Sequence, residues 1–338
     1  MPRAQTVLVT GGAGFIGSAA VRRLVAEGRS VVALDALTYA ADLDALAEVD
    51  GAPGYAFVEA DIRDAEAVHA AFAAHDPDAV LHLAAESHVD RSIDGPGDFV
   101  TTNVVGTAVL LEAARAHWEA LPAGRREASR FVHVSTDEVY GALGEAGVFS
   151  AASPYDPSSP YSASKAGSDH LARAWHRTYG LPTVVTHCSN NYGPWQHAEK
   201  LIPTVIRRAA AGEAIPVYGS GRNVRDWIYV DDHVDALVAA LDRGRPGATY
   251  LVGARTERTT LEIVGAVCDR LDAVRPAGAP HRDLVAFVAD RPGHDWRYAI
   301  DPSETERELG WAPRTSFGEG IAATVDWHLA RAEAEGSE

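Results

Sequence analysis

Tyr161 and Lys165 form the pattern YxxxK, a spacing that places both side chains on one face of a helix. A nearby ammonium favours the ionised form of a phenol, so we expect Lys165 to lower the pKa of Tyr161. Tyr161 could then accept the proton of an alcohol while a hydride leaves the alcohol carbon. Thr136 lies in the preceding motif VSTDEVYG, where its hydroxyl could share the same protons. YxxxK also occurs by chance on surface helices, and there it would carry no chemistry.

Asp137 and Glu138 are adjacent carboxylates that follow directly after a predicted strand. Two carboxylates near one ligand cannot both ionise easily, so the pKa of one rises and the pair can supply an acid and a base. Elimination of water needs such a pair, because one group removes a carbon-bound proton while the other protonates the departing hydroxyl. A solvated acidic turn is the alternative interpretation, and a plain dehydrogenase would need neither carboxylate.

Three glycines, Gly11, Gly14 and Gly17, follow the apolar run TVLVT and open a helix with the spacing GxxGxxG. They permit a tight turn and a close approach of the backbone to a dinucleotide pyrophosphate at the helix N-terminus. Asp35 ends the second predicted strand, where its carboxylate can accept hydrogen bonds from the adenosine ribose and would repel a 2′-phosphate. The pattern therefore predicts NAD as the cofactor rather than NADP.

Other polar residues follow the third and fourth predicted strands. Asp61 could reach the adenine or could only cap the next helix. Ser87, in the run HLAAESHVDRS, is a candidate sugar contact, because loops at the carboxyl edge of a sheet bind ligands. His82 is expected to be a strand residue with an ordinary hydrogen bond. The remaining residues that we assign to the cofactor site are Phe15, Ile16, Thr38, Ile62 and Ala84, together with Tyr161 and Lys165.

These motifs need a scaffold, and the first half of the chain alternates short apolar runs with longer helical stretches. Near-continuously apolar strands separated by helices imply a parallel sheet that is covered on both faces. We predict an α/β fold with a doubly wound parallel sheet of the Rossmann type, mainly in 1–182, and a smaller interleaved α/β lobe, mainly in 183–338. We expect an exposed loop at 273–280 and a frayed tail at 331–338. The predicted strands span 6–10, 30–35, 55–60, 79–84, 130–134, 183–187, 215–218 and 227–230.

Composition excludes several classes of protein. The 338 residues carry a net charge of −17, which would repel a phosphate backbone, so we expect no nucleic-acid partner. The N-terminal segment has the pattern of neither a signal peptide nor a membrane span, so we expect a cytoplasmic protein without a membrane partner. Cys188 and Cys268 are expected to be buried thiols. The histidines show no metal-ligand spacing, so we expect no bound metal.

Lysine is scarce in this chain. Among the 30 basic residues only Lys165 and Lys200 are lysines, and the others are arginines. Because arginine fills nearly every position that needs only a cation, a retained lysine can mark a site that needs a compact ammonium with a tunable pKa. Because only two lysines are present, their positions by chance are the alternative explanation.

The motifs together resemble those of the extended short-chain dehydrogenase/reductases, and within them the dTDP-glucose 4,6-dehydratases, over almost the whole chain. Sugar epimerases and UDP-glucuronate decarboxylases are similar over the glycine motif and YxxxK, but they lack the Thr-Asp-Glu triplet. The segments that carry the resemblance are GGAGFIGS, DALTYA, LAAESHVDRSI, TNVVGT, STDEVYG, SPYSASKA, CSNNYGP, EKLIP, RDWIYVDDH and DRPGHDWRYAID.

The resemblance implies a reaction and a set of residues for it. dTDP-glucose would become the 4-keto-6-deoxy sugar by oxidation at carbon 4, elimination of water across carbons 5 and 6 and return of the hydride to carbon 6, with tightly held NAD. Tyr161 would be the base at carbon 4, Asp137 the acid at the carbon 6 hydroxyl and Glu138 the base at carbon 5. Residues 1–182 would mainly bind NAD, and 183–338 mainly the nucleotide sugar. The implied substrate contacts are Ser87, Asn190, Glu199, Lys200, Leu201, Pro216, Tyr218 and His294, with Arg225 and Arg291 as forked clamps for the diphosphate.

Departures from the family pattern leave the nucleobase open. A 4,6-dehydratase of another nucleotide hexose, such as a UDP-linked one, and a nucleotide-sugar 4-epimerase are the alternative enzymes. A sensor protein that binds NAD but catalyses no reaction is the alternative from another class of protein. The resemblance also implies a homodimer through a four-helix bundle of helices near 98–118 and 161–179, and a monomer is the alternative. The departures are Ala151 and Ala152 in place of Thr-Glu, Trp195, His197 and Ala198 in place of Tyr, Phe and Pro, and Thr256 and Thr260 in place of asparagines.

Overall fold

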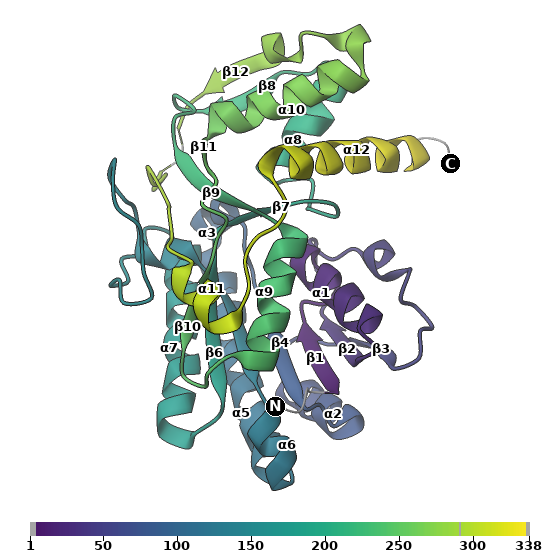
Figure 1. Ribbon diagram of the computed structural model, residues 1–338, viewed down its shortest axis with the longest axis vertical. Helices are drawn as coiled ribbons and strands as arrows, with labels where there is room; N and C mark the ends of the chain where they lie inside the picture. The colour runs from purple at the N-terminus through teal and green to yellow at the C-terminus, as the bar shows by residue number, and fades with distance from the viewer. Residues whose placement is uncertain (1–4, 291, 336–338) are drawn as a thin grey trace.

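Seven parallel strands form the central sheet of the computed structural model, which describes residues 5–290 and 292–335 (Figure 1). The strand order is β10-β6-β5-β4-β1-β2-β3, and every neighbouring pair runs parallel. The order changes direction beside β1, and folds of this kind bind ligands in the crevice at that point. The predicted fold class is confirmed. The strands are β1 (Thr6–Thr10), β2 (Ser30–Asp35), β3 (Tyr55–Glu59), β4 (Ala79–His82), β5 (Phe131–Thr136), β6 (Thr183–Cys188) and β10 (Thr249–Val252).

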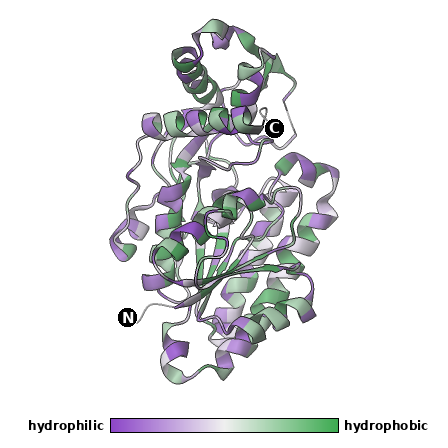
Figure 2. Ribbon diagram, turned by 90° about the vertical axis from the view of Figure 1, so that its right-hand side faces the viewer, coloured by the Kyte–Doolittle hydropathy of each residue, from purple (hydrophilic) through white to green (hydrophobic). Residues whose placement is uncertain are grey.

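The strands lie in the interior because they are apolar on both faces. In β1, Val7, Leu8 and Val9 have no exposed surface. Successive side chains point to opposite faces, so Val7 and Val9 pack in one hydrophobic cluster and Leu8 in another. Figure 2 shows hydrophobic residues along the strands and hydrophilic residues spread over the helices around them.

Helices cover both faces of the sheet. On one face α1 (Phe15–Ala26) packs beside α9 (Val230–Arg243). On the other face α5 (Thr107–Ala120) lies between α2 (Ala65–His75) and α7 (Pro160–Tyr179). Helix α9 and strand β10 come from the second half of the chain, so the chain returns to the first sheet, as Figure 1 shows. The other helices near this sheet are α3 (Val89–Asp94), α4 (Pro96–Phe99), α6 (Ala123–Ala128), α11 (Ser303–Leu309) and a π-helical segment at Val100–Gly106.

A smaller lobe follows at the carboxyl edge of the sheet. It contains a three-stranded sheet in the order β11-β9-β7 and a parallel pair of β12 and β8. Its helices enclose a hydrophobic core of their own. The elements are β7 (Asn190–Tyr192), α8 (Leu201–Ala210), β8 (Ile215–Tyr218), β9 (Val224–Tyr229), β11 (Glu257–Thr259), α10 (Thr260–Val274), β12 (Val285–Val288) and α12 (Phe317–Glu335).

One local expectation is wrong, and a second is confirmed in part. Helix α12 continues through Glu335, so the expected frayed tail is wrong for 331–335, while 336–338 lie outside the described residues. The helix end is held because Arg331 pairs with Asp42 at 2.9 Å and lies 4.3 Å from the ring centre of Trp195. The expected loop at 273–280 contains the end of α10 and a short 3₁₀ turn at Pro276–Gly278.

Cys188 and Cys268 are both free, but only Cys268 is fully buried, whereas Cys188 is half-buried. Within residues 5–290 and 292–335, no helix is long and apolar enough to cross a membrane. In the same described part of the chain, no three His, Cys, Asp or Glu side chains are grouped as metal ligands.

Candidate active site

A cavity of about 480 Å³ opens at the carboxyl ends of β1, β2, β4, β5 and β6. It is lined by most of the residues that the sequence singled out, although they are spread over the first 200 positions. All predicted cofactor residues line it, namely Gly11, Gly14, Phe15, Ile16, Gly17, Asp35, Thr38, Asp61, Ile62, Ala84, Tyr161 and Lys165. The catalytic and substrate candidates that line it are Thr136, Asp137, Glu138, Ser87, Asn190, Glu199 and Lys200.

The glycine turn brings the backbone of three segments into contact. Gly11 has a φ of +69°, and a Cβ there would lie 2.7 Å from the amide nitrogen of Ala84 on the β4 loop. A Cβ on Gly17 would lie 1.9 Å from the carbonyl oxygen of Gly11. The turn can therefore hold the start of α1 against β1 only without side chains, and it leaves a cradle of backbone groups at the helix N-terminus.

Gly17→Ala is expected to lower the free energy of unfolding by about 1–3 kcal/mol, because the new methyl group forces the turn apart. Urea denaturation of the purified variant measures this loss. Gly14→Ala is the matched control, since its Cβ would meet the same carbonyl oxygen of Gly11 at 3.3 Å and needs only a small shift. Equal midpoints for the two variants would contradict the assignment of Gly17 as the point of closest approach.

Asp35 connects the end of β2 to the glycine turn. One carboxylate oxygen accepts a hydrogen bond from the Ala13 amide at 2.9 Å, and the other accepts one from the Leu37 amide at 2.9 Å. Burial raises the pKa of this carboxyl, while these backbone hydrogen bonds lower it. Asp35 thus stabilises the glycine turn. It lies at the end of β2, where a contact with the adenosine ribose is predicted.

Asp61 lines the cavity but does not cap the following helix, so that alternative interpretation is wrong. The cap of α2 is Asp64, which accepts hydrogen bonds from the amides of Glu66 and Ala67. The Asp61 carboxylate instead pairs with the guanidinium of Arg63 at 2.6 Å. This hydrogen-bonded pair lowers the pKa of Asp61, so its carboxylate stays ionised as a hydrogen-bond acceptor.

Asp137 is a carboxyl group that the fold removes almost completely from water. β5 ends at Thr136, whose hydroxyl accepts a hydrogen bond from the Glu138 amide at 3.2 Å and starts the 3₁₀ turn Asp137–Tyr140. Asp137 is 1% exposed, and its Oδ2 has no hydrogen-bond partner among the described residues. Burial, followed by the nearby charges of Glu138 and Asp226, raises its pKa well above the ordinary value. Asp137 therefore keeps its proton more readily than an ordinary carboxyl group and can donate it.

Tyr161 and Lys165 lie on the first two turns of α7, which begins with a capping box at Ser159. The Lys165 ammonium donates a hydrogen bond to the carbonyl oxygen of Val134 at 2.9 Å. Burial, with Glu138 next, raises the pKa of the Tyr161 phenol well above its ordinary value. The expected lowering of this pKa by Lys165 is therefore wrong, because burial beside carboxylates outweighs an ammonium that is held by a backbone carbonyl.

Glu199 and Lys200 reach the opposite wall of the cavity from the loop before α8. The Lys200 ammonium donates to the backbone carbonyl of Ser87 at 3.1 Å, which joins the two predicted substrate residues. Glu199 lies 3.5 Å from the guanidinium of Arg91 and 3.8 Å from the imidazole of His88. These contacts tie the smaller lobe to the loop after β4.

The other predicted substrate residues do not line this cavity. Arg225, on β9, donates to the backbone carbonyl of Asp295 at 2.9 Å and stacks 4.1 Å from the ring centre of Tyr298. His294 contacts Asp290 at 2.6 Å, and its ring lies edge-on to Tyr218, 6.5 Å between ring centres. Pro216 shares β8 with Tyr218, and Leu201 begins α8. Arg291 lies outside the described residues.

Sequence reasoning missed Asp226, which lies on β9 beside Arg225 and is 1% exposed. Its Oδ1 accepts a hydrogen bond from the Thr256 amide at 2.6 Å, and its charge helps to raise the pKa of Asp137. In the sequence, Asp226 stood out only as the second residue of the motif RDWIYVDDH. Nothing in that motif says that β9 runs close to the end of β5.

Comparison with known proteins gives consistent matches. The family described as GDP-mannose 4,6 dehydratase matches residues 8–324. The dTDP-glucose 4,6-dehydratase of Xanthomonas campestris pv. campestris (strain B100) is 58% identical over 326 residues, which cover 96% of this chain and 93% of the relative. The dTDP-glucose 4,6-dehydratase 1 of Escherichia coli (strain K12) is 54% identical over 333 residues, which cover 96% of this chain and 92% of the relative.

Solved structures agree with these relatives. The dTDP-glucose 4,6-dehydratase DesIV from Streptomyces venezuelae, with NAD and TYD bound, has a TM-score of 0.88 and 46% identity over 97% of this chain and 98% of its own. The UDP-glucose 4-epimerase of Thermus thermophilus, in complex with NAD, has a TM-score of 0.85 but 33% identity, over 96% of this chain and 99% of its own. Dehydratases and epimerases thus share the fold, and the sequence separates them. Because relatives of 54% and 58% identity over 96% of its length are dTDP-glucose 4,6-dehydratases, the chain belongs to the dTDP-glucose 4,6-dehydratase family of the extended short-chain dehydrogenase/reductases.

Proposed function

We infer that this protein is an NAD-dependent hydro-lyase that converts dTDP-glucose to dTDP-4-keto-6-deoxyglucose. The observation that carries this function is the buried carboxyl of Asp137, whose pKa is raised, beside Glu138 in the cavity that also contains Tyr161. An epimerase or a simple dehydrogenase has no use for an acid at this position, whereas elimination of water requires one.

The residues present fit NAD. The turn at Gly11 and Gly17 leaves room for a pyrophosphate where any Cβ would collide with backbone, and the N-terminus of α1 faces that room. The Asp35 carboxylate lies at the end of β2, where it favours a free ribose diol over a 2′-phosphate. When bound, NAD supplies a hydride acceptor that can later give the hydride back.

Four side chains of the chain then divide the proton transfers. Tyr161, in its ionised form and with Thr136 beside it, takes the proton of the carbon 4 hydroxyl as that carbon is oxidised. Because burial raises the pKa of this phenol, only the enzyme molecules with an ionised Tyr161 begin the reaction. The resulting ketone acidifies the carbon 5 proton, which Glu138 removes, while Asp137 protonates the hydroxyl that leaves carbon 6. Carbon 6 then receives the hydride and carbon 5 a solvent proton, so that substrate and product differ by one water molecule.

Substrate deuterated at carbon 4 is expected to give product that carries the deuterium at carbon 6, because the same hydride is removed and returned without exchange. Mass spectrometry and proton NMR of the product measure its position. Deuterium that returns to carbon 4 would identify an epimerase. Deuterium that is lost to free reduced cofactor would identify a simple dehydrogenase, and either result would overturn the proposed function.

We further propose that the part based on the large sheet, 1–182, mainly binds NAD and that 183–338 mainly binds the nucleotide sugar. A homodimer through α5, the preceding π-helical segment and α7 is also proposed. It is supported by Val100 and Val105, which are 50% and 49% exposed on that segment. Two free cysteines are consistent with the reducing cytoplasm, which we propose as the compartment.

A further inference from the structure

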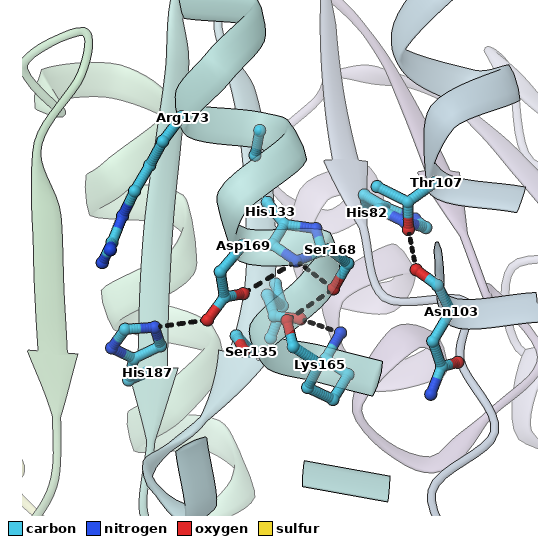
Figure 3. A network of polar contacts seen from close by, with 12 residues as sticks. His82, Asn103, Thr107, His133, Ser135, Lys165, Ser168, Asp169, Arg173 and His187 are labelled. Atoms are coloured by element: carbon cyan, nitrogen blue, oxygen red, sulfur yellow. Dashed lines mark hydrogen bonds and ion pairs between the residues drawn. The ribbon is translucent and has the colours of Figure 1, made fainter. Parts of the chain in front are cut away.

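A buried polar cluster lies behind the active-site cavity, between the sheet and α7. Asp169 is flanked by His133 from β5 and His187 from β6, and none of the three side chains has any exposed surface (Figure 3). The Asp169 oxygens lie 3.1 Å from Nε2 of His133 and 2.9 Å from Nε2 of His187. A carboxylate in such a position would be costly unless it had a defined task or full compensation.

Hydrogen bonds hold Asp169 as a carboxylate. Because a carboxylate only accepts, Nε2 of His187 carries the hydrogen toward Oδ2. The Tyr155 hydroxyl donates to the same oxygen at 2.9 Å, and the Tyr140 hydroxyl lies 2.6 Å from Nδ1 of His187. Burial alone would raise the pKa of Asp169, but His187 and His133 lower it below its ordinary value.

Lys165 precedes Asp169 by four residues on α7, so the two side chains lie one helical turn apart on the same face. Lys165 is 4% exposed, and burial lowers the pKa of its amine. The other groups around the ammonium compensate less. His82 on β4 and His133 on β5 have lowered pKa values and are neutral at pH 7, and Cys188 on β6 raises the Lys165 pKa less than Asp169 does. Among the described residues, Asp169 is the carboxylate whose charge acts on Lys165.

We propose that Asp169 is a positioning residue that keeps Lys165 in its ammonium form, and that His133 and His187 hold the Asp169 carboxylate in place for this task. On strand β5, His133 contacts the carboxylate (Figure 3). The backbone carbonyl of the next residue, Val134, accepts a hydrogen bond from the Lys165 ammonium, so one strand positions both partners. The use of this ammonium beside Tyr161 rests on the proposed function, but the effect of the Asp169 charge on Lys165 does not.

The scarcity of lysine allows a direct test on the whole protein. Lysine labelled with ¹³C at Cε gives two signals, from Lys165 and Lys200, and the variant Lys200→Arg assigns them. Asp169→Asn is expected to lower the pKa of Lys165 by roughly one to three units, the usual effect of losing a nearby opposite charge. The Lys200 signal should titrate as before. An unchanged Lys165 titration would overturn the proposal, and it would do so whatever reaction the enzyme catalyses.

Two further variants separate a charge effect from loss of structure. Asp232→Asn is the matched control, because Asp232 is also buried, at 4% exposure, and accepts backbone hydrogen bonds from Arg314 and Thr315. It should destabilise the fold without moving the Lys165 titration. Should Asp169→Asn not fold, Asp169→Ala removes the same charge without burying an amide, so it should also lower the Lys165 pKa. A Lys165 pKa that stays the same in a folded Asp169→Ala protein would then contradict the proposal.

The pH dependence of turnover supplies a second readout. An amine works as an ammonium only below its pKa, so activity on the alkaline side falls as the pH rises through the pKa of Lys165. In Asp169→Asn this fall is expected at lower pH, with activity recovering toward that of the parent enzyme as the pH is lowered. A uniform loss at every pH would indicate a merely structural role and would contradict the proposal. Turnover that is absent from the parent enzyme itself would count against the proposed function instead.

Discussion

Asp137→Asn is expected to slow the elimination of water by roughly 10²–10⁴-fold, because an amide has no acidic proton to give to the departing hydroxyl. Oxidation at carbon 4 should continue, since it depends on Tyr161 and not on Asp137. Single-turnover absorbance at the wavelength of reduced nicotinamide, followed together with the keto-sugar product, measures the two stages separately. Rapid product formation without a build-up of reduced cofactor would contradict the role of Asp137.

Glu138→Gln is the matched variant for that experiment, because it should prevent the removal of the proton from carbon 5. In D₂O, recovered substrate should gain deuterium at carbon 5 from the Asp137→Asn enzyme, in which Glu138 still removes that proton. It should gain none from the Glu138→Gln enzyme. The reverse pattern would exchange the roles of the two carboxyl groups.

The pH dependence of elimination follows from the raised pKa of Asp137. The acid is competent only when protonated, so elimination should persist above the ordinary pKa of an aspartic acid and fall as the pH rises through the raised pKa of Asp137. The residual elimination of Asp137→Asn should lack that alkaline fall.

Lys165→Arg is expected to reduce kcat by roughly 10²-fold, the usual cost of displacing a catalytic group by about 1 Å. Lys165 is 4% exposed between α7 and the sheet, and its Nζ lies 2.9 Å from the Val134 carbonyl. A longer, planar guanidinium keeps the charge but cannot occupy the same volume. Steady-state kinetics measures the loss, and circular dichroism checks that the variant is folded.

Lys200→Arg is the control for this substitution. Lys200 is half-buried and donates to the carbonyl of Ser87 on the cavity wall, so its replacement should raise KM more than it lowers kcat. Near-native turnover in Lys165→Arg would mean that lysine persists there for no chemical reason.

The fold could be predicted because its signals are local. Apolar runs such as TVLVT form strands, and the glycine spacing after β1 fixes the turn that opens α1. Because carboxyl ends of parallel strands meet at one edge, residues after β1, β2, β4 and β5 had to share a cavity once the sheet was correct. That is why Gly11, Asp35, Ser87 and Asp137 could be assigned to one site from their positions alone.

Contacts made by individual side chains were harder to predict. The Asp61 carboxylate pairs with Arg63, and Asp64 caps α2. From the sequence alone, either aspartate could have capped this helix. Arg225 uses its guanidinium on the Asp295 carbonyl and the Tyr298 ring, which come from a segment about 70 residues later. Such partners depend on how distant segments pack, and no local pattern encodes that packing.

By itself the sequence determined the sheet, the glycine turn, and the adjacency of Asp137 and Glu138, which predicted that one of the two carboxyl groups would have a raised pKa. Only the tertiary structure showed that Asp137 is such a group and that the pKa of Tyr161 is raised rather than lowered. Burial is the largest cause in both cases, and Asp226 reaches Asp137 from a strand that lies 89 positions away along the chain. The pKa of an ionisable group depends on how far the surrounding segments remove it from water, and those segments meet only when the chain has folded.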